Sequence, residues 1–134
     1  MFELAVTPEA EADLEKLWSS DNAAAADLTV LVEELRDNQV TLAAMHVHQR
    51  MEGRVHISRL LEMRARRLDL WRLKVYELDD PKQIVPYRIV YAYDNANKIY
   101  YIIAYMHRSV DYERDPEFSR RIQNAYKNLG IPEL

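Results

Sequence analysis

The most regular pattern of apolar and polar positions lies between residues 70 and 112. Apolar and polar side chains alternate in residues 71–76, and in residues 87–93 tyrosine and isoleucine alternate with arginine, valine and alanine. This period of two is typical of a β-strand with one buried face. Residues 99–106 are apolar throughout, which favours a strand covered on both faces. Polar loops at 79–82 and 94–97 separate these segments, so the pattern predicts an antiparallel β-meander.

Helical patterns precede the meander. A short apolar strand is expected at residues 2–6, and Thr7 followed by Pro8 predicts the start of a helix whose apolar face includes Trp18. A second helix is expected to begin at Asp21 or Asn22 and to end near residue 36, with its leucines on one face. These two helices form a hairpin that needs a sheet to cover its apolar face.

A closing helix is expected after the meander. Asp115 and Pro116 predict its start, apolar residues then recur at helical spacing, and Gly130 supplies the left-handed stop. The basic residues Arg120 and Arg121 are expected to be exposed on this helix.

Residues 39–69 have the least regular pattern. Residues 41–47 fit either a helix or a strand, and residues 51–54 are typical of a turn. Residues 55–67 predict a short amphipathic helix capped by Ser58, with basic side chains on its polar side at Arg59, Arg64, Arg66 and Arg67. The elements together predict a single α+β domain over residues 1–134: an N-terminal strand and helical hairpin, then an antiparallel β-meander and a C-terminal helix, with 39–69 as a long connection or insert.

Charge is distributed unevenly along the chain. The 134 residues carry a formal net charge of −4, yet residues 1–38 hold 10 acidic and 2 basic side chains, whereas residues 39–92 hold 10 basic and 6 acidic ones. A phosphate responds to the local field more than to the total charge, so the second segment can face an anion. Separate solvated faces would give the same distribution. With no cysteine, no apolar run of about 20 residues and no signal peptide, we expect a cytoplasmic protein without disulfides.

Three motifs in a fixed order resemble a known family. WRLKVYEL at residues 71–78, PYRIVYAYD at 86–94 and YYIIAYMHRSVDY at 100–112, followed by a helix, are similar to the RelE/ParE superfamily of type II toxin–antitoxin toxins. They are most similar to its ribosome-dependent mRNA endonuclease branch, the RelE/HigB-like toxins. The similarity extends loosely over residues 2–18 and well over 70–128, and it implies a RelE-like fold. Residues 39–69 depart from the pattern.

Six side chains have the chemistry that metal-independent RNA cleavage needs. In this reaction the 2′-hydroxyl attacks the neighbouring phosphate, so a base, an acid and cations that stabilise the developing charge are required. The resemblance places Arg88 against the scissile phosphate. The expected site therefore has an RNA-binding pair on the first meander strand and catalytic candidates on the next two, which can converge on one sheet face: Arg72 and Lys74 for RNA binding; Arg88, His107, Arg108 and Tyr112 for catalysis.

Other roles stay open for these residues. Arg72 and Lys74 also fit an ordinary solvated strand face, and Arg88 can pair with an acid. The unperturbed pKa of histidine, about 6.5, suits an acid or base, but a histidine at a strand end is often structural. His107 competes with Tyr112 for the proton-transfer role because members of the family differ in the residue they use. Tyr112 can instead stack on an unpaired base.

The remaining histidines allow a metal site to be considered. His46 and His48 have the spacing of neighbours on one strand face, and His56 can supply a third ligand. No cysteine accompanies them and no acid is clearly placed, so contact with RNA or a partner, or plain exposure, is favoured. We expect no metal and no cofactor.

The resemblance implies a toxin that cleaves mRNA in the A site of the 30S ribosomal subunit and leaves a 2′,3′-cyclic phosphate. It also implies a cognate antitoxin that covers the basic face, contact with operator DNA only through the antitoxin complex, and no membrane association. Two alternatives share the fold. One is a ParE-like toxin that inhibits DNA gyrase, and the other is a non-catalytic binding module, which the acidic pI of about 5.6 keeps open.

Overall fold

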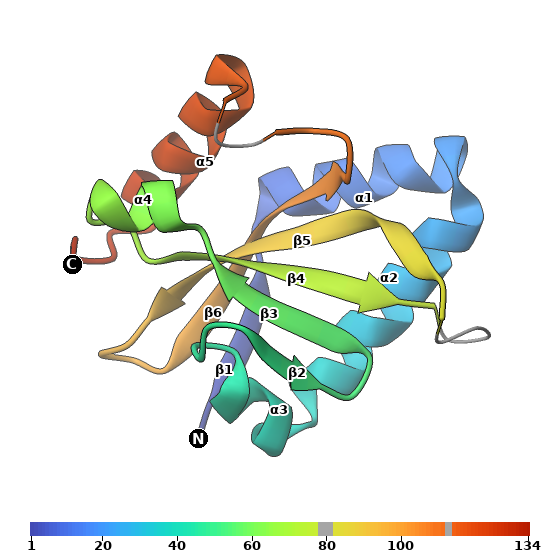
Figure 1. Cartoon of the computed structure of the whole chain (residues 1–134), viewed down its shortest axis with the longest axis horizontal. Coiled ribbons are helices and arrows are strands. Elements are labelled where there is room, and N and C mark those ends of the chain that lie inside the picture. The colour runs from blue at the N-terminus through green and yellow to red at the C-terminus, as the bar shows by residue number, and fades with distance from the viewer. Residues whose placement is uncertain (78–81, 112–113) are drawn as a thin grey trace.

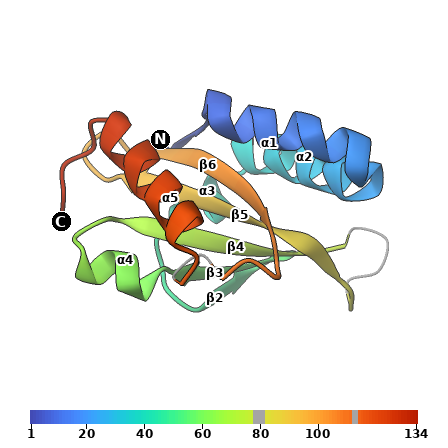
Figure 2. The same cartoon turned by 90° about the horizontal axis from the view of Figure 1, so that it is seen from above.

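A six-stranded sheet lies between two layers of helices in the computed structural model, which describes residues 1–77, 82–111 and 114–134 (Figures 1 and 2). The strand order is β1 (Glu3–Val6), β6 (Ile99–His107), β5 (Ile84–Asp94), β4 (Leu70–Tyr76), β3 (Val55–Arg59) and β2 (Arg50–Glu52). β1 pairs in parallel with β6, and the other neighbouring pairs are antiparallel. The predicted α+β fold and its meander are confirmed.

One face of the sheet is covered by α1 (Pro8–Ser20), α2 (Asn22–Arg36) and α3 (Gln39–Ala44), and we call this the α1–α2 side. The predicted helix starts are correct: the Thr7 hydroxyl accepts from the Ala10 N–H at 3.3 Å, and the Asp21 carboxylate accepts from the Ala24 N–H at 3.1 Å. These bonds satisfy backbone donors that the first helical turn leaves without a partner.

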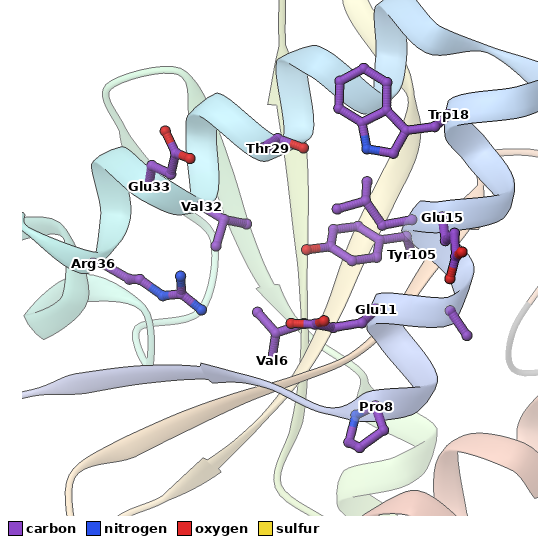
Figure 3. A pocket seen from close by; sticks show the side chains of 12 residues that line it. Val6, Pro8, Glu11, Glu15, Trp18, Thr29, Val32, Glu33, Arg36 and Tyr105 are labelled. Carbon is purple, nitrogen blue, oxygen red and sulfur yellow. The ribbon is translucent and has the colours of Figure 1, made fainter.

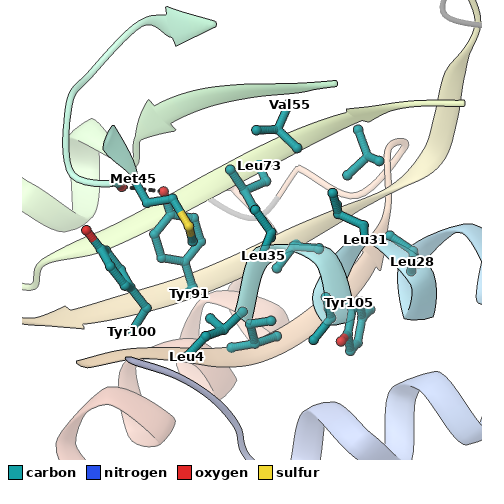
Figure 4. Packing of buried hydrophobic residues seen from close by; sticks show 14 of the residues in the cluster. Leu4, Leu28, Leu31, Leu35, Met45, Val55, Leu73, Tyr91, Tyr100 and Tyr105 are labelled. Carbon is teal, nitrogen blue, oxygen red and sulfur yellow. Dashed lines mark hydrogen bonds between the residues drawn. The ribbon is translucent and has the colours of Figure 1, made fainter. Parts of the chain in front are cut away.

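The main core lies on the α1–α2 side. Leucines of α2 pack against Leu73 of β4 and against the rings of Tyr91 and Tyr100 (Figure 4). The two buried phenols are satisfied because Tyr91 donates to the carbonyl of Met45 and Tyr100 donates to that of Leu42. Tyr91 and Tyr100 therefore anchor α3 and its C-terminal cap to the sheet.

The opposite face, which we call the α5 side, is covered in part by α4 (Leu61–Ala65) and α5 (Pro116–Asn128). Ile122 and Tyr126 of α5 are fully buried, and the helix begins with Asp115 and ends before Gly130 as predicted. In β6, Ile102 belongs to the α1–α2 core and Ile103 to the α5 core. The prediction of a strand covered on both faces is confirmed.

Residues 39–69 differ from the prediction. The prediction of an amphipathic helix over residues 55–67 is wrong, because residues 55–59 form β3 and only Leu61–Ala65 are helical. Ser58 is buried within β3 and caps nothing, since α4 follows Leu60 without a side-chain cap. Val55 and Ile57 are β-branched and buried, so pairing with β4 overrides the helical pattern. Residues 41–47 fitted either a helix or a strand in the sequence; the first four of them, 41–44, belong to α3.

Two side-chain expectations are also corrected. Trp18 does not lie in the core but is 46% exposed. Arg121 is not simply exposed: it donates to the Asp13 carboxylate at 2.6 Å and to the Ile103 carbonyl at 3.4 Å. Asp13 also accepts from the Tyr105 N–H at 3.1 Å. Because β1 pairs only with residues 99–102 of β6, this ion pair closes the edge of β6 that β1 leaves open.

No helix among the described residues is both long and apolar enough to span a bilayer. Residues 79–81 of the predicted loop between the first two meander strands lie outside the described residues.

Candidate functional site

The sheet register places three of the predicted cations together. Lys74 of β4 is the direct cross-strand partner of Arg88 of β5, and Arg72 lies two residues before Lys74 on the same strand face. The alternating neighbours Leu73 and Ile89 point into the core of the α1–α2 side, so the cations point to the α5 side. All three side chains are half-buried. We call Arg72, Lys74 and Arg88 the cationic cluster.

A histidine that the sequence did not assign to this site extends the cluster. His56 of β3 is the cross-strand partner of Lys74, so His56, Lys74 and Arg88 form one row across three strands. Side chains directly opposite each other on neighbouring strands have Cβ atoms about 5 Å apart. One phosphodiester group can therefore contact neighbouring members of this row.

Burial and the neighbouring positive charges lower the pKa values of two residues in this row. Burial, together with the positive charges of Arg88 and Arg72, lowers the pKa of Lys74. Burial, together with Lys74 and Arg72, and to a smaller extent His48, lowers the pKa of His56. Since the ordinary value for histidine is about 6.5, His56 is mainly neutral at pH 7 and its imidazole can accept a proton. An anion bound at the row would relieve the repulsion.

His107 does not join the cluster. It is the cross-strand partner of Tyr87, which packs on the α1–α2 core, whereas Arg88 is paired with Met106 on the α5 side. The His107 ring meets the Tyr87 ring edge-on at 5.2 Å, and its Nδ1 lies 2.7 Å from the Ser109 hydroxyl. The expectation that His107 and Arg88 converge on one face is therefore wrong.

The two other predicted catalytic residues follow β6. Arg108 is exposed, and its backbone N–H donates to the Pro86 carbonyl at 2.8 Å, which ties the end of β6 to β5. Tyr112 lies outside the described residues.

A second basic surface lies between the end of α4 and α5. It is a groove of about 450 Å³ whose charged lining residues, among those described, are all basic. Serine, glutamine and asparagine side chains supply hydrogen-bonding groups between them. Such a lining suits a phosphate backbone. The basic residues are Arg66, Arg114, Arg120 and Lys127.

A third surface feature has the opposite charge. Between α1 and α2, above Tyr105 of β6, lies a groove of about 520 Å³ with the exposed Trp18 at one end (Figure 3). Its charged lining consists of the carboxylates of Glu11, Glu15 and Glu33 and the guanidinium of Arg36, so acids predominate. Burial raises the pKa of Tyr105 to about 12, so its phenol stays neutral at physiological pH. We call this feature the α1–α2 groove.

The histidines considered for a metal site have separate roles. His46 stacks on Tyr93 at 4.8 Å and its Nδ1 lies 2.8 Å from the Tyr100 hydroxyl, while the His48 Nδ1 accepts from the Arg59 N–H at 2.8 Å. Among the residues that the structure describes, no group of three or more histidine, cysteine, aspartate and glutamate side chains could hold a metal ion.

Comparison with known families identifies the class of protein. The family described as "ParE toxin of type II toxin-antitoxin system, parDE" matches residues 4–112. The chain therefore belongs to this toxin family, within the RelE/ParE superfamily that the motifs indicated, and an antitoxin is its implied partner. No curated protein and no solved structure matches it.

Sequence reasoning missed His56 and the α1–α2 groove. The alternation of Val55, Ile57 and their polar neighbours has the period of a strand and would have placed His56 on the face of Lys74. The longer helical pattern through residue 67 favoured a helix over this short strand-like alternation. Nothing in the local sequence shows that Trp18 stays exposed, because its exposure depends on how α1 packs against α2.

Proposed function

We propose that this toxin is a ribosome-dependent mRNA endonuclease whose cationic cluster binds the scissile phosphate. The proposal rests on one observation above all, which is that Arg72, Lys74 and Arg88 gather on one half-buried patch of three cations. Like charges directly opposite each other on a sheet repel, and a bound phosphate would offset that repulsion.

Each member of the cluster has a role in this reaction. An arginine guanidinium can hold two phosphate oxygens at once, which suits Arg88 and Arg72 for orienting the backbone. Lys74 lies between them and supplies a compact positive charge to the phosphorane as the 2′-hydroxyl attacks. The sequence also offers Tyr112 as an acid or base. Arg108 is a further cation near the end of β6.

The ribosome would supply what the free protein lacks. With a net charge of −4, the toxin has little general attraction for RNA, so the message would be oriented by ribosomal RNA and protein. The basic groove between α4 and α5 lies on the same side of the sheet as the cationic cluster and suits a ribosomal RNA backbone.

The antitoxin is proposed to use two surfaces. The resemblance implies that it covers the basic face, which would block substrate. The α1–α2 groove is a second candidate contact, since its apolar floor and three rim carboxylates fit an amphipathic antitoxin segment with basic side chains. The acidic balance of residues 1–38 favours such a segment.

Gyrase inhibition is the second candidate. The placement of His107 on the face opposite Arg88 favours it, because the catalytic set expected from the resemblance is then incomplete. The printed description of the matching family, ParE toxin, favours it as well.

Purified components test the choice. The wild-type toxin is expected to cleave mRNA only when the message is bound to ribosomes, and the upstream fragment should end in a 2′,3′-cyclic phosphate. Arg88→Ala should abolish cleavage, whereas Lys16→Ala on the opposite side of the sheet should not. A wild-type toxin that leaves ribosome-bound mRNA intact and instead blocks supercoiling by DNA gyrase would overturn the proposal.

A further inference from the structure

We propose that His56 is the proton acceptor in RNA cleavage by this toxin, a role that rests on the proposed function and that the sequence had assigned to His107 or Tyr112. His56 is the histidine that the sheet register brings to the cationic cluster, in direct line with Lys74 and Arg88. His107, by contrast, points to the other face and is engaged by Tyr87 and Ser109.

The position of His56 suits proton transfer in three respects. Its side chain is half-buried, so it is held in place yet accessible from the α5 side. Its neighbour across the strand pair is Lys74, so a phosphate bound to Lys74 brings its ribose within reach of the imidazole. The charged and titratable groups that lower its pKa are Lys74 and Arg72 on β4 and His48 before β2, and a neutral imidazole is the form a base requires.

His56 and Lys74 can supply the base and the acid that the cleavage reaction needs. The His56 imidazole takes the proton of the ribose 2′-hydroxyl as the 2′-oxygen forms its bond to phosphorus. The bond between phosphorus and the 5′-oxygen then breaks, and the Lys74 ammonium, whose pKa is lowered, donates a proton to the leaving 5′-oxygen. The products are a 2′,3′-cyclic phosphate and a 5′-hydroxyl. Imidazolium and amine return to their starting forms by proton exchange with water.

This assignment gives residues 39–69 a function. This segment, which lies outside the three sequence motifs, includes β2 and β3, and they extend the meander at the edge beside β4. The added β3 strand carries His56 to the cluster. The toxin thus completes its site with a strand that the motif pattern does not contain.

The test is the single-turnover rate of mRNA cleavage on programmed ribosomes for wild-type toxin, His56→Gln and His107→Gln. His56→Gln is expected to slow cleavage about 10²- to 10⁴-fold, the usual worth of a general base. The wild-type rate should rise with pH as the His56 imidazole loses its proton and then level off, and His56→Gln should lose this rise. His107→Gln is the matched control and should keep the wild-type rate, since His107 points to the opposite face of the sheet.

Folding and proton transfer are separated by a second measurement. Each variant should bind the antitoxin and unfold at a temperature close to that of the wild type. Cleavage by His56→Gln at the wild-type rate, or a large loss in His107→Gln with an unchanged pH profile in His56→Gln, would overturn the assignment while leaving the proposed function intact. A wild-type toxin that cleaves no ribosome-bound mRNA would overturn both.

Discussion

Lys74 of β4 and Arg88 of β5 are direct cross-strand partners, so two cations face each other on the half-buried α5 side of the sheet. Like charges directly opposite each other on neighbouring strands repel, so this pairing is unfavourable taken by itself. Burial, together with this repulsion, lowers the pKa of Lys74. We interpret the pair as a phosphate-binding feature that costs the fold some stability.

Replacing Lys74 by glutamate should therefore stabilise the fold and inactivate the toxin. The new carboxylate would face Arg88 and Arg72, so the free energy of unfolding is expected to rise by about 0.2–1 kcal/mol. Urea denaturation measures this change, and growth after induction of the variant measures toxicity. Lys16→Glu makes the same charge change on the acidic helix α1 and should not stabilise. A less stable Lys74→Glu protein would contradict the interpretation.

Acidification should destabilise the toxin through His56. Its folded-state pKa is lowered below the value of about 6.5 expected in the unfolded chain, so the unfolded state binds the proton more readily. This contribution to stability is complete above about pH 6.5 and is lost as the pH falls below it. The free energy of unfolding, measured by denaturant titration on both sides of this value, should fall less in His56→Gln than in the wild type. Equal losses in the two proteins would show that His56 is not perturbed.

The edge of β6 should depend on Asp13. Asp13→Ala removes an ion pair with Arg121 and leaves the Tyr105 N–H without its acceptor, so the free energy of unfolding should fall by about 1–3 kcal/mol. Glu15→Ala, an exposed acid on the same helix, should change it by no more than about 0.5 kcal/mol. A double-mutant cycle with Arg121→Ala isolates the pairwise term, and additive effects would exclude coupling.

Antitoxin binding to the α1–α2 groove should change the fluorescence of Trp18. Trp18 is 46% exposed and Trp71 only 1%, so a shift to shorter wavelength on complex formation would report the first ring. Trp18→Ala should lose the shift and weaken binding by about tenfold or more, because large aromatic side chains often dominate an interface. An unchanged spectrum with full affinity in Trp18→Ala would place the antitoxin elsewhere.

The meander could be predicted from the sequence because its alternation is long and agrees with its turns. Leu73 and Ile89 are buried, and Lys74 and Arg88 share the other face, as a period of two requires. The helix N-caps at Thr7, Asp21 and Asp115 could also be predicted, because capping depends on residues that are close in the sequence.

The remainder depends on contacts that are distant in sequence. Residues 55–59 form a strand because β4 pairs with them, and that partner is invisible to a local pattern. Arg88 and His107 point to opposite faces because Arg88 pairs with Met106, whereas His107 pairs with Tyr87. This pairing follows a register shift between Val90 and Tyr91. A slip of one residue reverses the face to which a side chain points. The order of the motifs in the sequence does not reveal such a register shift.

The most direct test of the account maps transcript 5′ ends in cells after the toxin is induced without its antitoxin. We expect new ends within translated regions, absent from an untranslated copy of the same message and absent when Arg88→Ala is induced at equal level. Unchanged transcript ends in growth-arrested cells, together with altered plasmid supercoiling, would contradict the account and assign the toxin to DNA gyrase.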